Sequence, residues 1–155
     1  MLRSKDVLFQ RTGVSRLMTV LAAPGGVQLV AAAVENNGAA DALVRIVSNA
    51  SVPTAPKKWW FTRRRVPRVP SQQGADPGAD TAVVSRREAR VACAGVAASA
   101  LRKMAAEPAI ATAMRSRGSG LAASLLAASR DEGLDRNVRD TMGEAHALLV
   151  AGEGK

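Results

Sequence analysis

Apolar residues recur at spacings of three and four along most of the chain, which is the period that places them on one face of an α-helix. One such stripe lies within residues 135–151 and consists of Val138, Met142, Ala145 and Leu149, with Gly152 just beyond it. Another consists of Val91, Ala94, Ala98, Leu101 and Ala105. These stripes predict two amphipathic helices in which the named positions are buried.

A start signal precedes the second of these stripes. In the capping box Ser85-Arg86-Arg87-Glu88, the serine oxygen can accept from the Glu88 amide while the glutamate accepts from the serine amide. The sequence therefore predicts a helix that begins at Ser85 and runs to about residue 106.

Two short segments resemble each other 80 positions apart: residues 30–38 read VAAAVENNG and residues 110–118 read IATAMRSRG. Each ends in a glycine, which can adopt the left-handed conformation that closes a helix. Each also follows a proline, Pro24 or Pro108, which can stop the preceding helix and open the next. We therefore expect two short helices, closed by Gly38 and Gly118.

Apolar segments at 39–50 and 120–129 follow the two glycines and predict a further helix in each copy. The composition agrees with an all-α protein, because the chain has no Tyr, two Trp and two Phe, and its apolar residues are mostly Ala, Val and Leu. The same order of helices thus occurs twice.

This order of helices resembles the armadillo repeat. It consists of a long helix, a proline-started short helix closed by glycine, a medium helix and another long helix. Residues 97–152 look like the end of one repeat and one full repeat, and residues 14–50 look like a weaker copy. The resemblance implies a short right-handed superhelical array of about two repeats that binds other macromolecules without catalysis. The chain departs from the family pattern in its few repeats and in the long insert that interrupts the first.

The insert, residues 51–84, is expected to be a loop because it holds five of the seven prolines. We divide the remainder into N-terminal helices (1–50), a long helix with the second repeat (85–152) and a tail (153–155). The centre of the insert places six cations around three of the four aromatic residues: Lys57, Lys58, Trp59, Trp60, Phe61, Arg63, Arg64, Arg65 and Arg68. Its net charge is +4, out of +9 for the whole chain.

RNA, protein and lipid are alternative partners of these nine residues. Cations neutralise phosphates while indoles stack on unpaired bases, as in the recognition of single-stranded or looped RNA, rRNA included. Aromatic side chains also fill pockets on other protein subunits, and Trp with Lys or Arg suits anionic lipid at a membrane interface. If the insert is only a linker, binding is expected on the helical faces that carry Arg86, Arg87, Arg90, Arg115 and Arg117.

Residues suited to catalysis are scarce. The single histidine, His146, flanks the stripe of the last helix without a partner motif. Gly118-Ser119-Gly120 has neither the following Lys-Ser/Thr nor the preceding strand of a phosphate-binding loop. We expect no enzyme activity, cofactor, metal site or small-molecule substrate. The lone Cys93 excludes an intramolecular disulfide and is predicted to be a small core residue.

The N-terminal residues are similar in composition to a mitochondrial import signal. Met1-Leu2-Arg3-Ser4-Lys5 is followed by Arg11 and Arg16 among apolar residues, whereas Asp6 is atypical because such signals avoid acids. No apolar run is long enough for a transmembrane helix or a secretory signal. We expect a mitochondrial location, in the matrix or on the matrix face of the inner membrane, with the cytoplasm as the alternative.

These observations predict a non-catalytic structural subunit of a large organellar assembly, because two repeats leave both end faces of the array uncovered. A pI near 11.2 favours a polyanionic environment, so a mitochondrial ribosome is the first candidate. The alternative is an accessory subunit of a respiratory or ATP-synthase complex of the inner membrane. A soluble cytosolic or ciliary adaptor of armadillo type is the second alternative.

Overall fold

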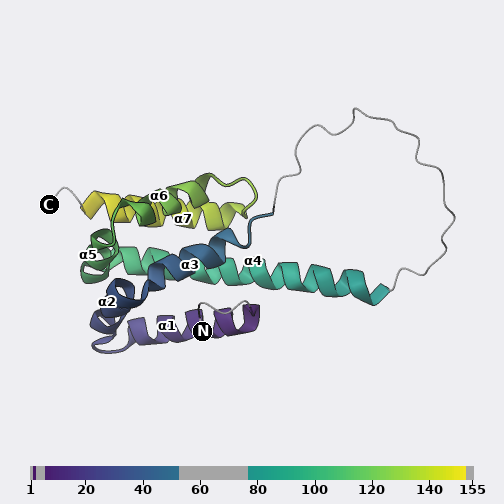
Figure 1. Ribbon diagram of the computed structural model, residues 1–155, viewed down its shortest axis with the longest axis horizontal. Coiled ribbons are helices and arrows are strands. Elements are labelled where there is room, and N and C mark those ends of the chain that lie inside the picture. Colours follow the sequence, from purple (N-terminus) through teal and green to yellow (C-terminus); the bar gives the residue numbers. More distant parts are fainter. Residues whose placement is uncertain (1, 3–5, 53–76, 153–155) are drawn as a thin grey trace.

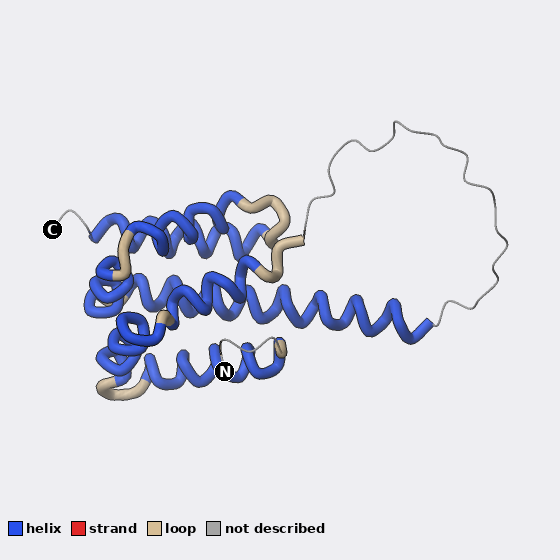
Figure 2. Tube along the Cα trace, viewed as in Figure 1, coloured by secondary structure: helices blue, strands red, loops and turns tan. Residues whose placement is uncertain are grey.

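The computed structural model describes residues 2, 6–52 and 77–152, and this part of the chain is all-helical, without a strand (Figures 1 and 2). Its helices are α1 (Val7–Ala22), α2 (Gly26–Asn37), α3 (Ala39–Ser48), α4 (Pro77–Ala106), α5 (Pro108–Ser116), α6 (Ser119–Arg130) and α7 (Arg136–Ala151). The all-α class predicted from the apolar stripes is confirmed.

The helices stack in corresponding pairs. The long helices α1, α4 and α7 run side by side in the same direction, and α4 packs between the other two (Figure 1). The short helices α2 and α5 pack against each other, as do the medium helices α3 and α6. The repeated order in the sequence therefore corresponds to a repeated arrangement in space, as in a helical repeat.

The turn between α1 and α2 differs in detail from the prediction. Pro24 lies within the turn and does not open α2, which begins at Gly26 after Gly25 with φ 75°. Gly26 is buried because the carbonyl group of Val20 in α1 lies directly where a Cβ would be. The start of α2 can therefore approach the end of α1 only because residue 26 has no side chain.

The two glycines that close the short helices adopt different conformations. Gly38 is left-handed, with φ 62° and ψ 42°, as predicted. The left-handed conformation predicted for Gly118 is wrong, because its φ of 93° is positive but its ψ of 172° is extended. In the second copy α5 already ends at Ser116, and Gly118 leads directly into α6. Pro108, in contrast, does open α5.

The long helix α4 begins at Pro77, so the prediction that it begins at the capping box is wrong. Ser85 lies inside the helix, and residues 77–84, which we assigned to the insert, are helical. Proline is well tolerated in the first turn of a helix, where its missing N–H has no intrahelical acceptor. Pro77 therefore opens this helix and does not mark a loop.

The core is centred on α4 and includes buried side chains of α3, α5 and α7. The predicted stripe of α7 is confirmed: Val138, Met142, Ala145 and Leu149 are its buried residues. The stripe predicted for α4 was too narrow, because Ala97, Ala100 and Met104 are buried beside Ala94, Ala98, Leu101 and Ala105, and Val91 is only half-buried. This helix packs against α1, α3, α5 and α7, so more than one of its faces is covered.

Candidate interaction surfaces

The nine residues of the predicted basic-aromatic site, 57–68, lie outside the described residues. The structure does describe Val52, the last residue before the part of the insert that is left out. The Val52 N–H donates to the Gly133 carbonyl at 3.0 Å, and Gly133 lies in the turn between α6 and α7. The insert therefore begins beside the second copy of the repeat.

Arg117, one of the five arginines of the alternative site, joins the two copies of the repeat. Its Nε lies 3.0 Å from the Asp41 carboxylate in α3, and its guanidinium donates to the Glu35 carbonyl in α2 at 2.9 Å. The same ion pair lies against Gly38, whose missing Cβ would approach the Asp41 carboxylate at 3.0 Å. Arg117 therefore has a structural role.

Arg115 is also engaged within the chain. Its guanidinium donates to the Leu149 carbonyl at 3.1 Å, which satisfies a backbone acceptor in the last turn of α7, and to the Thr112 hydroxyl at 3.3 Å. The last turn of α7 is thereby fastened to α5. Arg115 and Arg117, which the sequence offered as part of a partner-binding face, thus both have intramolecular contacts.

Arg86, Arg87 and Arg90 differ from these two, because all three are exposed on the first half of α4. Within the described residues, none of them forms an ion pair or a hydrogen bond. They are therefore the members of the alternative site that remain available to a partner.

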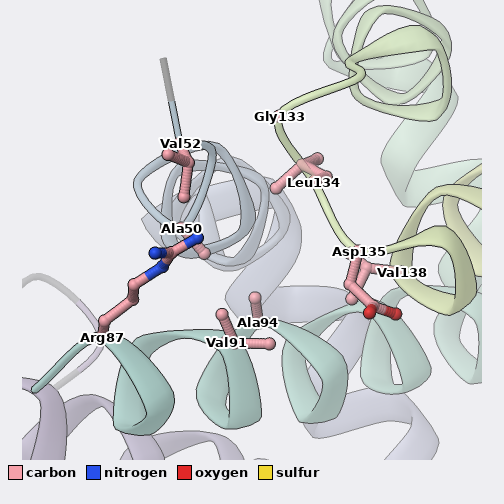
Figure 3. A pocket seen from close by; sticks show the side chains of 9 residues that line it. All are labelled: Ala50, Val52, Arg87, Val91, Ala94, Gly133, Leu134, Asp135 and Val138. Carbon is pink, nitrogen blue, oxygen red and sulfur yellow. The ribbon is translucent and has the colours of Figure 1, made fainter. Parts of the chain in front are cut away.

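A groove of about 260 Å³ opens beside these arginines, between α3, α4 and the turn before α7 (Figure 3). Val91, Ala94, Leu134 and Val138 contribute apolar side chains to its lining. Arg87 extends from α4 toward Ala50 and Val52 on one side of the groove, and Asp135 lies on the other (Figure 3). The Asp135 carboxylate caps α7, because it accepts from the Asn137 N–H at 2.9 Å. Arg87, the other charged residue of the groove, forms no hydrogen bond or ion pair within the described residues.

Large apolar side chains remain uncovered at the end of the stack that α1 and α2 form. Leu8 and Phe9 in α1 are 71% and 54% exposed, and Leu29 in α2 is 67% exposed. At the opposite end, Leu148 and Val150 in α7 are each 41% exposed. Large apolar side chains that stay exposed on the outermost helices of a stack are typical of surfaces that another molecule covers.

Cys93 is buried, as predicted for a small core residue, and its burial raises the pKa of the thiol. His146 is half-buried beside the packed stripe of α7. The described residues contain no cluster of His, Cys, Asp or Glu that could hold a metal ion. No helix in the described ranges is both long and apolar enough to cross a membrane.

Comparison with known proteins gives no relative for this chain: no protein-family model, curated protein or solved structure matches it.

Proposed function

We propose that this chain is a non-catalytic interaction subunit of a large assembly, built as a short armadillo-type array whose end faces are covered by other subunits. The observation that supports this most is the set of uncovered side chains at one end of the stack, Leu8, Phe9 and Leu29. In a repeat array each unit buries its apolar face against its neighbours, and arrays that stand alone need polar capping units.

The exposed residues of α1 are not all apolar, since Thr12, Ser15, Arg16 and Thr19 are also exposed. The most exposed apolar side chains of these two helices therefore lie at the start of α1 and in α2, and Val20 near the end of α1 is less exposed. This distribution favours a partner that packs on one part of the end face, with polar contacts along the remainder of α1.

The proposed host is a ribonucleoprotein, with a mitochondrial ribosome as the first candidate. The net charge of +9, the basic residues 57–68 and the exposed arginines of α4 all favour polyanionic surroundings. The mitochondrial location rests on the import-like composition of the first 17 residues. An accessory subunit of a respiratory or ATP-synthase complex remains the alternative host, with matrix-side protein and lipid contacts. A soluble cytosolic or ciliary adaptor is the second alternative.

Sedimentation of the tagged protein in a detergent extract, with and without ribonuclease, separates these hosts. In a ribosome-like particle the protein should sediment with a large complex, and ribonuclease should shift it to lighter fractions. If it instead stays in a membrane-derived complex that ribonuclease does not change, the ribonucleoprotein host is wrong. Sedimentation as a free small protein in both samples would contradict every host assembly and leave only the adaptor.

Replacement of Trp59 and Trp60 by alanine should release the protein from its host without changing its helix content. Each buried Trp at a binding hot spot contributes on the order of 2 kcal/mol or more, and neither residue belongs to a described helix. The measurement is co-purification with the host from cells, together with circular dichroism of the purified variant.

Replacement of Arg63, Arg64 and Arg65 by glutamine distinguishes RNA from protein at the same site. If these residues contact phosphates, binding should weaken and become less dependent on salt. If the indoles occupy a protein pocket, the arginine variant should bind nearly as well as the parent. Normal assembly of both the tryptophan and the arginine variants would show that residues 57–68 are not a binding site.

A further inference from the structure

The first half of α4 extends past its neighbours. α4 has 30 residues, whereas α1 and α7, which lie on its two sides, have 16 each. The three helices end close to one another, and at the other end α4 continues beyond both (Figure 1). At 1.5 Å per residue, the excess of 14 residues is about 21 Å of helix that α1 and α7 do not cover.

Arginines occupy three of the positions in this extension that continue the buried stripes of the second half. Arg86 and Arg90 precede Cys93 and Ala97 at spacings of four, three and four. Arg87 precedes Val91, Ala94 and Ala98 at the same spacings. In the second half of α4 these stripes are buried from Cys93 onward, whereas the three arginines are exposed. The side of the helix that faces the core thus continues as a cationic surface.

A cation from α1 lies on the same side. Arg11 is exposed, and it lies close enough to Cys93 that its charge partly offsets the rise that burial causes in the pKa of the thiol. The one acid within residues 86–92, Glu88, is two residues from both Arg86 and Arg90. Two residues span about 200° of a helix, so Glu88 lies on the side opposite Arg86 and Arg90. It is adjacent to Arg87, and the two residues line one shallow pocket.

We infer that these side chains form a binding surface for the phosphate backbone of RNA. This α4 arginine surface consists of Arg11, Arg86, Arg87 and Arg90. An apolar partner helix docked along it would bury guanidinium groups without counter-charges, which is unfavourable. A helix that lies on a membrane needs an apolar face, and here positions 86, 87 and 90 of the core-aligned side are charged. Successive phosphates supply the anionic acceptors that guanidinium groups bind through paired hydrogen bonds.

This inference rests on the proposed ribonucleoprotein host and adds a binding site in the helical body of the chain. The groove of Figure 3 places the surface next to the start of the insert, because Arg87 and Val52 both line it.

The test is binding of the purified full chain to a short fluorescein-labelled RNA at several salt concentrations. The variant carries Arg86→Gln, Arg87→Gln and Arg90→Gln. The matched control carries Arg45→Gln, Lys103→Gln and Arg130→Gln, which remove the same three charges from exposed positions without ion pairs in the described structure. Circular dichroism verifies that both variants retain the helix content of the parent.

The α4 variant should bind the RNA about tenfold more weakly or worse near physiological salt, with the slope of log affinity against log salt reduced by about two. The control should change affinity by no more than about twofold. Equal losses in the two variants would overturn the site while leaving RNA binding by the chain intact. Loss of binding to phosphatidylserine vesicles, with RNA binding unchanged, would instead assign the surface to a membrane. A parent chain that does not bind the RNA would overturn the site together with the RNA contacts of the proposed function.

Discussion

Replacement of Gly26 by alanine should lower the free energy of unfolding by about 2 kcal/mol or more. A Cβ at this position would overlap the backbone carbonyl of Val20, which belongs to α1 and cannot rotate away as a side chain can. Either α2 moves away from α1 or the last turn of α1 opens, and both changes uncover core residues such as Val30. The measurement is urea unfolding of the purified chain, followed by circular dichroism.

Gly95 provides the matched control for this substitution. It lies inside α4, where an added Cβ would meet no atom within 4 Å. Alanine there should stabilise the chain by about 0.5–1 kcal/mol, because glycine loses more conformational entropy than alanine when a helix forms. If Gly26→Ala is as stable as Gly95→Ala, the close approach of α1 and α2 is wrong. All variants are compared at one protein concentration, since self-association adds to apparent stability.

Replacement of Leu101 by alanine should cost about 2–5 kcal/mol, the second large effect that we expect. Leu101 is fully buried in α4, the helix that packs against α1, α3, α5 and α7. Removing its isobutyl group leaves a cavity in the centre of the core, and rigid helices on several sides limit how far that cavity can collapse. The same urea titration measures the effect.

The control for Leu101 is Leu29→Ala in α2. Leu29 is 67% exposed, so its truncation should change the unfolding free energy by no more than about 0.5 kcal/mol. It should, however, weaken association with the host if the end face of the stack is a contact. Similar destabilisation by the two leucine substitutions would show that α4 is not the centre of the core.

The hydrophobic pattern was sufficient to predict the helices that have a single buried face. In α7, every buried position follows from the spacing of Val138, Met142, Ala145 and Leu149, because its packing against α4 and α6 buries this one stripe. The repetition of residues 30–38 at 110–118 likewise predicted which helices correspond, and α2 packs against α5 accordingly.

Features that depend on contacts between distant residues could not be predicted from the pattern. The broad buried surface of α4 arises because several helices cover it, and small residues such as Ala97 and Ala100 carry no periodic signal in an Ala-rich segment. The start of α4 was misplaced because a plausible capping box competed with Pro77, and proline is common both in loops and at the first turn of helices.

The same limit applies to the candidate site. Arg115 and Arg117 looked equivalent to Arg86, Arg87 and Arg90 as exposed cations, and only the fold shows that they reach the Leu149 carbonyl and the Asp41 carboxylate. One signal was present in the sequence: Arg86, Arg87 and Arg90 continue the buried stripes of their own helix. Residues 57–68 stay a prediction, because they lie outside the described residues.

The most direct test of the central claim, that this chain is a subunit with uncovered end faces, is sedimentation velocity of the purified full chain over a range of concentrations. The account predicts self-association that increases with concentration, because Leu8, Phe9 and Leu29 are exposed at one end of the stack and no partner covers them. A chain that stays monomeric and monodisperse at every concentration would contradict it.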